Sequence, residues 1–161
     1  MIRDATEADA AAIAAIYAPY VRDTAATFEL EPPPALEIAA RIAQAQARHA
    51  YLVAEQDGEV VGYAYAGALR PRPAYDRSCE SSVYLRQGLR RSGTGRALME
   101  ALLERLRQRG LHAVIAGVVP PNEASVGLHR ALGFVDAGVW KQVGFKHDRW
   151  WDVAWFQMTL G

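Results

Sequence analysis

Apolar residues are spaced along this chain in several distinct patterns, and each pattern predicts one kind of element. Two apolar runs, 51–55 and 60–66, are separated by Asp57-Gly58, which is a strong signal for a β-hairpin turn. Over 36–49 the apolar residues instead recur at the spacing of an amphipathic helix. A second helical pattern runs over 93–109 and is followed by a glycine, a common helix stop. The chain therefore contains both strands and helices.

The same signals divide the rest of the chain. Further strands are expected at 1–3, 79–85, 113–119 and 151–160, with strand pieces at 134–135 and 139–140. Further helices are expected at 6–20 and 124–132. The proline-rich segments 22–34 and 70–73 predict loops. The resulting order, β-α-α-β-β-β-α-β-α-β-β, favours a central mixed sheet with helices on both faces.

The loop after the strand at 79–85 carries the strongest chemical signal. It contains Arg90-Arg91-Ser92-Gly93-Thr94-Gly95-Arg96 and leads directly into a helix. Backbone N–H groups at a helix start are unpaired and carry the positive end of the helix dipole, which suits a phosphate. The glycines let the backbone approach an anion closely, and the arginines add positive charge. The R-x-x-G-x-G pattern differs from the two common nucleotide loops, G-x-x-x-x-G-K-[ST] and G-x-G-x-x-G.

Composition narrows the class of protein. The 161 residues are 51% hydrophobic and 22% charged, as is ordinary for one globular domain, expected here to span 1–161. The 18 basic residues balance 18 acidic ones, so the basic excess of a nucleic-acid binder is missing. The single cysteine, Cys79, fits a reducing cytoplasm. Because the sequence has neither a signal peptide nor an apolar run of membrane-spanning length, we expect a cytoplasmic protein without membrane partners.

Three blocks of sequence carry a resemblance to a known family. The strand, the R-x-x-G-x-G loop and the helix after it resemble the pyrophosphate loop of the GNAT superfamily, the acyl-CoA-dependent N-acetyltransferases. The segment 122–134 is similar to the superfamily's helix four, N-x-x-S/A…Y/H-x-x-L-G-F. The blocks 70–84 and 143–153 resemble the phosphinothricin/methionine sulfoximine acetyltransferase family. The resemblance implies the GNAT fold, an α/β (α+β) fold in which four helices flank a mixed, mostly antiparallel sheet of about seven strands.

The resemblance also implies acetyl-CoA as co-substrate. In this family pattern, main-chain groups of the strand hold the pantetheine arm, the glycine-containing loop wraps the pyrophosphate, and Asn122 lies near the thiol end. Arg90 stands where many relatives have glutamine. The cofactor-binding residues implied are Val83, Tyr84, Leu85, Arg90, Arg91, Ser92, Gly93, Thr94, Gly95, Arg96, Asn122 and Ser125.

A small amino acid is the acceptor that the resemblance implies. Its carboxylate and second polar head call for cationic partners, for which Arg70, Arg72 and Lys146 are candidates, and we expect at least one of them to be a bystander. The substrate-binding residues expected are Phe28, Glu29, Arg72, Pro73, Ala74, Tyr75 and Lys146. The family further implies a homodimer, with the C-terminal strands and the segment 141–150 near the partner.

Acetyl transfer to an amine needs a base, oxyanion donors and in some enzymes an acid. Glu80 is the candidate base, and apolar surroundings would raise its pKa toward the working range. It could instead be an exposed edge carboxylate or half of a structural ion pair. His129 stands where most GNAT enzymes have tyrosine, and it is a candidate acid or base or else a helix histidine satisfied by a nearby carbonyl. The backbone N–H of Leu85 is the candidate oxyanion donor.

The histidines outside this set lack metal-ligand spacing, so no metal site is expected. The function predicted is transfer of acetyl from acetyl-CoA to the α-amine of a small amino acid analogue by direct attack. Two alternatives stay open at this point. One is a peptide or protein N-terminal acetyltransferase, which would need an open groove. The other is a CoA-binding regulatory domain without turnover.

Overall fold

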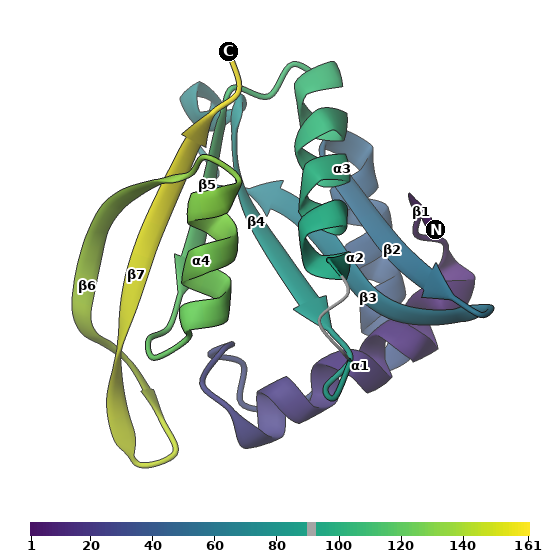
Figure 1. Ribbon diagram of the computed structural model, residues 1–161, viewed down its shortest axis with the longest axis horizontal. Coiled ribbons are helices and arrows are strands. Elements are labelled where there is room, and N and C mark those ends of the chain that lie inside the picture. Colours follow the sequence, from purple (N-terminus) through teal and green to yellow (C-terminus); the bar gives the residue numbers. More distant parts are fainter. Residues whose placement is uncertain (90–92) are drawn as a thin grey trace.

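The computed structural model describes residues 1–89 and 93–161, and a seven-stranded sheet runs through it (Figure 1). The strands are β1 (Ile2–Asp4), β2 (Ala50–Gln56), β3 (Glu59–Ala68), β4 (Ser78–Leu85), β5 (Ala113–Val118), β6 (Val135–Lys146) and β7 (Arg149–Thr159). The α-helices are α1 (Ala10–Asp23), α2 (Ala35–Arg48), α3 (Thr94–Gln108) and α4 (Glu123–Ala131). Short 3₁₀ turns occupy Glu7–Asp9 and Pro73–Tyr75. This order confirms the predicted fold.

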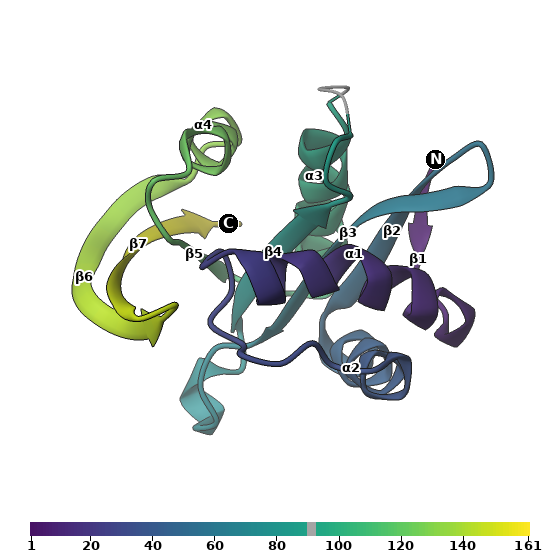
Figure 2. The same cartoon turned by 90° about the horizontal axis from the view of Figure 1, so that it is seen from below.

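The helices lie in two layers on opposite faces of the sheet. Figure 2 shows α1 and α2 on one side and α3 and α4 on the other. Each layer buries its own apolar cluster, one built around α3 with Leu98 and Leu102, the other around α1 and α2 with Ile13 and Ile38. The strands follow the order β1-β2-β3-β4-β5-β7-β6, and β4 with β5 is the parallel pair.

The parallel pair separates part-way along its length. β4 and β5 are paired at Ser78, Cys79 and Glu80, but β4 continues to Leu85 and β5 to Val118. Beyond Glu80 the two strands therefore diverge, and each leaves one backbone edge without its neighbour. This divergence at the centre of the sheet positions the site described below.

The expectation of two short strand pieces near 134–140 was wrong. The segment forms one long strand, β6, which pairs with β7 as a curved hairpin at the end of the sheet. Its register shifts between Asp136 and Val139 and again between Trp140 and Gly144. Gly138 lies in one of these shifts, with a φ of 107°. Because bulges interrupt the two-residue alternation, the apolar pattern indicated pieces where the backbone is continuous.

The first helix also begins and ends later than expected. Thr6 does provide a start signal, because it forms a capping box with Asp9, but the turn that it opens is a 3₁₀ turn. The α-helix proper begins at Ala10, contains Pro19 and continues to Asp23. Among the described residues, no helix is long and apolar enough to cross a membrane.

Candidate active site

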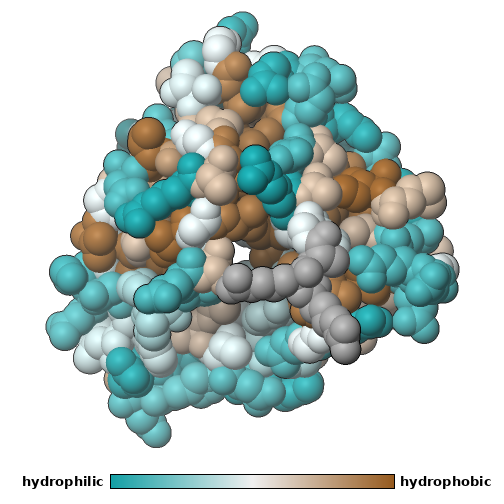
Figure 3. All heavy atoms as spheres, viewed as in Figure 1, coloured by the Kyte–Doolittle hydropathy of each residue, from teal (hydrophilic) through white to brown (hydrophobic). Residues whose placement is uncertain are grey.

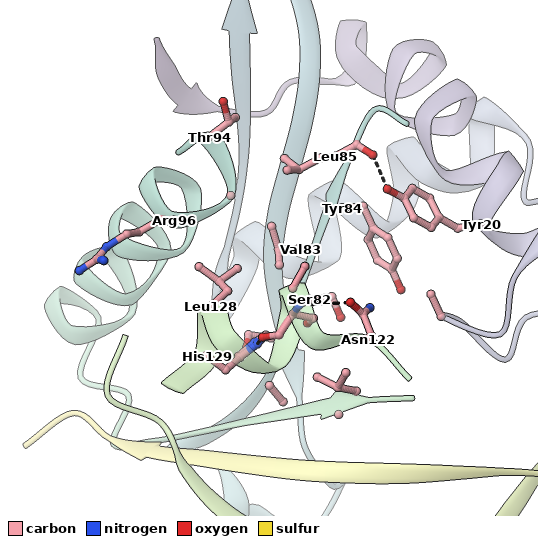
Figure 4. Close-up of a pocket in the computed structure, with 18 of the residues that line it drawn as sticks. Tyr20, Ser82, Val83, Tyr84, Leu85, Thr94, Arg96, Asn122, Leu128 and His129 are labelled. Atoms are coloured by element: carbon pink, nitrogen blue, oxygen red, sulfur yellow. Dashed lines mark hydrogen bonds between the residues drawn. The ribbon is translucent and has the colours of Figure 1, made fainter. Parts of the chain in front are cut away.

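A cavity of about 470 Å³ lies where β4 and β5 diverge. Its wall is built from β4, β5, the start of α3, one side of α4 and Tyr20 of α1, as the close-up in Figure 4 shows. Figure 3, which shows the molecule from the same side as Figure 1, has a hollow near the centre of the surface. The predicted site residues that line the cavity are Val83, Tyr84, Leu85, Gly93, Thr94, Gly95, Arg96, Asn122, Ser125 and His129. The fold thus brings residues 83–85 and 93–96 together with the segment 122–129 around one cavity.

The backbone of β4 presents hydrogen-bonding groups to this cavity. The N–H of Arg86 donates to the carbonyl of Val61 at 2.8 Å, so Arg86 is paired with β3. Backbone groups of successive residues in a strand point to opposite sides, and those of Val83 and Leu85 therefore face away from β3. With β5 no longer paired there, these groups face the cavity. An extended amide-bearing ligand could pair with them as a further strand would.

The start of α3 forms one end of the cavity. Gly93 precedes the helix with a φ of 76°, in the left-handed region that favours glycine. The Arg96 guanidinium pairs with Glu100 at 2.7 Å, and Thr94 accepts a hydrogen bond from Gln56 on the β2–β3 side at 3.2 Å. Arg90, Arg91 and Ser92 lie outside the described residues. The described part of the loop therefore offers the helix N-terminus that the sequence predicted.

Asn122 and Ser125 belong to the opposite wall. The Asn122 side-chain oxygen accepts from the backbone N–H of Ser125 at 3.2 Å, so it caps the N-terminus of α4. Asn122 therefore has a structural role as a helix cap, and this role is independent of any contact with a ligand in the cavity. The cap engages one lone pair of the amide oxygen, and the amide nitrogen can still donate to a ligand.

His129 lines the cavity but is itself buried. Its Nδ1 lies 2.8 Å from the carbonyl of Ser125, and its ring packs edge-on against Phe134 with centroids 5.0 Å apart. A carbonyl only accepts, so Nδ1 carries the proton and Nε2 of the neutral ring is an acceptor. Burial lowers the pKa of His129, and the bond to Ser125 opposes that effect only in part. The contact with a nearby carbonyl is therefore confirmed, and the catalytic role of His129, which also lines the cavity, stays a prediction.

Glu80 is neither an edge carboxylate nor half of an ion pair. It is half-buried in β4, the central strand of the sheet, and no cation of the described chain lies within ion-pair distance of it. By strand alternation its side chain shares the α1–α2 face with Ser82 and Tyr84. Burial raises the pKa of Glu80, and the charge of Arg70 lowers it by less. Glu80 does not belong to the cavity wall described above, and the fold places it and His129 on different sides of the sheet.

Three of the expected acceptor residues form a cluster that does not line that cavity, although Ala26 of the same loop does. Lys146 is 3% exposed, and its Nζ donates to the carbonyl of Thr27 at 2.8 Å. The Phe28 ring lies on the backbone of Gly144, where an added Cβ would come within 2.3 Å of it. Glu29 pairs with Arg41 at 2.5 Å. Burial raises the pKa of Glu29, but its neighbours, Arg41 first among them, bring the pKa below its usual value.

The other expected acceptor residues lie in a second exposed segment. Arg72 precedes the 3₁₀ turn that contains Pro73, Ala74 and Tyr75, and all four are exposed. None of the four lines the cavity. Arg70, just before them, is the residue whose charge acts on Glu80. The segment 70–75 is therefore related to Glu80 through the charge of Arg70, and it does not line the cavity that contains the phosphate end of the site.

Sequence reasoning missed several cavity residues. Tyr20, Ser81 and Leu128 line the cavity without having been expected there. A tyrosine or leucine at helical spacing is more often a core residue, and so the sequence carried no signal for them. Within the described ranges, no group of three or more histidine, cysteine or acidic side chains could hold a metal ion.

Comparison with known proteins decides the family. A family model described as an acetyltransferase (GNAT) domain matches residues 2–155. The chain belongs to the GNAT acetyltransferase family. It is 45% identical to a phosphinothricin N-acetyltransferase of Alcaligenes faecalis over 161 residues, which cover 99% of this chain and 82% of that protein. It is 42% identical to an L-methionine sulfoximine/L-methionine sulfone acetyltransferase of Pseudomonas paraeruginosa, over 99% and 94% of the two chains.

Solved structures agree with this assignment. A GNAT superfamily phosphinothricin acetyltransferase from Sinorhizobium meliloti, crystallised with acetyl-CoA, has a TM-score of 0.95 and 41% identity, and the match covers 100% of this chain and 88% of that one. This GNAT protein is accordingly an acetyl-CoA-dependent N-acetyltransferase. Its residues fit that co-substrate, because the open edge of β4 suits an amide-bearing arm and the start of α3 suits a pyrophosphate.

Proposed function

We propose that this GNAT enzyme transfers acetyl from acetyl-CoA to the α-amine of a small amino acid analogue of the phosphinothricin or methionine sulfoximine/sulfone type. The observation that carries the proposal is the half-buried Glu80 beside the open edge of β4. It puts a carboxylate of raised pKa next to the strand that would hold the thioester. The acceptor class is supported by the relatives named above. The amine nitrogen attacks the acetyl carbon, the C–S bond breaks, and CoA leaves as the thiol.

Glu80 is the general base of this proposal. Only the free amine attacks, so the ammonium proton must be removed, either directly or through a water. A carboxylate held in partly apolar surroundings is a stronger base than an exposed one, because burial penalises its charge. The charge of Arg70 opposes that effect in part, and the pKa of Glu80 stays above its usual value. A raised pKa suits a carboxylate that must accept a proton.

Two further groups of the proposal act on the acetyl carbonyl oxygen and on the proton that leaves the acceptor amine. The N–H groups of Val83 and Leu85 both face the cavity. Leu85, the candidate from the sequence, lies beside Gly95 at the phosphate end. The Val83 N–H, which is nearer to Glu80 along β4, is therefore assigned to the oxyanion. His129 is neutral near pH 7 because burial lowers its pKa, and its Nε2 is an acceptor. We assign His129 the role of a second proton acceptor, in preference to that of the acid that protonates the departing thiolate.

The acceptor side of the site lies on the α1–α2 face of β4. The pKa of Tyr65 on this face is raised first by burial, and the carboxylates of Glu29 and Glu80 both contribute to the rise. Glu29 of one expected acceptor segment thus lies close enough to the same face to act on Tyr65 together with Glu80. The other segment, Arg72–Tyr75, follows Arg70, whose charge acts on Glu80. Arg72 is exposed and is assigned to the substrate carboxylate. Lys146 donates to the carbonyl of Thr27, and we assign it the role of holding the loop between α1 and α2 in place.

A homodimer is part of the proposal. Large apolar side chains are exposed along β6 and at the start of β7, at the end of the sheet. They are Val135, Val139, Trp140, Val143, Phe145 and Trp150, each 47–64% exposed. An apolar strand edge of this kind is a liability unless it is covered, and a second copy would cover it. Light scattering on the purified protein should give twice the chain mass of 17.7 kDa, and a monomer would contradict this part. Cytoplasmic location stays a prediction.

Thiol release from acetyl-CoA tests the proposed function. The acceptors are L-methionine sulfoximine, L-methionine sulfone, phosphinothricin, glutamate, methionine and short peptides. Turnover confined to the small analogues is expected. Turnover with peptides alone would replace the proposal with N-terminal acetylation. Tight acetyl-CoA binding without thiol release on any amine would indicate a regulatory domain.

A further inference from the structure

Gly117 leaves an open position on the same face of the sheet as Glu80. It lies on β5, is exposed and lines the cavity where β4 and β5 diverge. Its neighbours along the strand, Ala116 and Val118, are buried in the apolar cluster built around α3. Because side chains alternate along a strand, position 117 belongs to the opposite face, which is the α1–α2 face that Glu80 shares.

The strand register places this open position close to the proposed base. Ile115 on β5 is the direct partner of Glu80. Gly117 is two residues further along β5, in the direction in which β4 and β5 diverge. Two residues of strand span about 7 Å, and neighbouring strands lie about 5 Å apart. An amino acid whose amine approaches Glu80 therefore has position 117 within reach of its own side chain.

Trp155 closes the far side of the open position. It lies on β7 and is the direct strand partner of Gly117. A Cβ added to Gly117 would come 3.0 Å from Cζ3 and 3.2 Å from Cη2 of Trp155, both in the six-membered ring of the indole. The indole also packs on Trp140 of β6, with ring centroids 4.6 Å apart. The outer edge of the indole is thus placed beside Gly117.

The glycine and the tryptophan depend on each other. Carbon atoms pack best at about 3.5–4.0 Å, so a side chain at position 117 would collide with the indole unless the ring moved. The Nε1 of Trp155 is buried and has no hydrogen-bond partner in the described part of the chain. Packing against its neighbours therefore holds the ring where it is. A phenyl ring at 155 would lack the two atoms that approach position 117.

We propose that Gly117 and Trp155 set the size limit of the acceptor site, with the acceptor side chain lying over Gly117 and its end meeting the edge of the Trp155 indole. The inference deepens the proposed function and rests on it, because that function brings an amino acid analogue to Glu80. Methionine sulfoximine, methionine sulfone and phosphinothricin all carry a methyl group at the end of the side chain. An apolar ring edge suits a methyl group, whereas the charged end of glutamate would lose its hydration there.

The test compares L-methionine sulfoximine with L-buthionine sulfoximine, which share one polar head and differ in a methyl against a butyl group. Thiol release gives kcat and KM for both acceptors in the wild type, Trp155→Phe, Gly117→Ala and the double variant. The ratio of the two kcat/KM values does not depend on how much of a variant is folded. Gly117 has the backbone of a strand, so alanine adds a methyl group without left-handed strain.

The wild type should prefer the methyl compound by at least about tenfold, and Trp155→Phe should lower this preference at least about threefold. Gly117→Ala should raise KM for methionine sulfoximine about tenfold in the wild type but less than about threefold in Trp155→Phe, because the two positions are coupled through their contact. Acetyl-CoA Kd, measured by calorimetry, should hardly change in Trp155→Phe.

An unchanged preference in Trp155→Phe would overturn the inference and leave the proposed function intact. So would an effect of Gly117→Ala that is the same with tryptophan and with phenylalanine at 155. If the wild type acetylates only short peptides, the proposed function fails. Peptides that begin with alanine or with leucine then measure the same size limit, and an unchanged preference between them in Trp155→Phe would overturn the inference as well. Thiol release with none of these amines would overturn both.

Discussion

Lys146 on β6 donates its Nζ hydrogen to the backbone carbonyl of Thr27, 119 positions earlier, at 2.8 Å. The bond joins the C-terminal hairpin to the loop between α1 and α2. The Phe28 ring, which lies on Gly144, makes a second contact between the same two segments. The loop that carries Phe28 and Glu29 is therefore held in place by a strand from the other end of the chain.

Replacing this lysine should loosen the loop. In Lys146→Met the Thr27 carbonyl loses its donor inside the protein, which should cost about 1–3 kcal/mol of unfolding free energy. Acceptor KM should rise several-fold, while acetyl-CoA Kd should change little because neither Lys146 nor Thr27 lines the cavity. Thermal unfolding and steady-state kinetics measure both effects. The exposed Lys141→Met is the matched control, and equal acceptor KM in the two variants would refute the role.

Glu80→Gln should lower kcat at pH 7 by 10²–10⁴-fold, the range of a general base. Burial raises the pKa of Glu80, and a base works only when deprotonated. The wild-type rate should therefore fall as pH drops through that raised pKa, and the variant should lack this acid limb. Acetyl-CoA Kd should hardly change. Glu59→Gln, in an exposed ion pair with Arg86, is the control. Wild-type turnover in Glu80→Gln would remove this carboxylate from the mechanism.

Gly93→Ala tests the phosphate end. Gly93 and Gly110 flank the two ends of α3 with φ of 76° and 82°, and an added Cβ at either would meet no atom of the described residues within 4 Å, its chain neighbours aside. Both alanine variants should thus lose a similar 1–2 kcal/mol or so of stability through left-handed strain. Only Gly93→Ala should weaken acetyl-CoA binding, by about tenfold, measured by calorimetry. Equal affinities in the two variants would sink the assignment of this loop to the pyrophosphate.

Much of the fold could be predicted from local pattern. The hairpin turn at Asp57-Gly58 has the positive φ of 52° and 79° that its residues favour, and α3 occupies nearly the whole range that its periodicity predicted. Turn chemistry and helical spacing are local properties, and so one sequence suffices to recognise them. The long strand β6 was divided wrongly because its bulges break the local period.

The candidate site was predictable where it follows from local structure. The unpaired N–H groups that suit an anion are a local property of a helix start, and a cap such as Asn122 is encoded within a few residues. The contact of Tyr20 with Leu85 and that of Lys146 with Thr27 depend on how distant segments pack. No spacing in the sequence encodes such contacts. Lys146 was accordingly expected to face the substrate, whereas the fold buries it against a carbonyl.

His129→Gln separates the two roles open to this histidine. Burial lowers its pKa, and Nδ1 is committed to the Ser125 carbonyl, so the ring is neutral at pH 7 and above. A neutral ring does not serve as the acid that protonates the thiolate, and the alkaline limb of the kcat profile should therefore be the same in wild type and variant. We expect kcat to fall by about tenfold, as for loss of an auxiliary proton acceptor that supports a primary base. A loss of a thousandfold together with disappearance of the alkaline limb would instead make His129 the acid, with its proton held by the folded enzyme against the effect of burial.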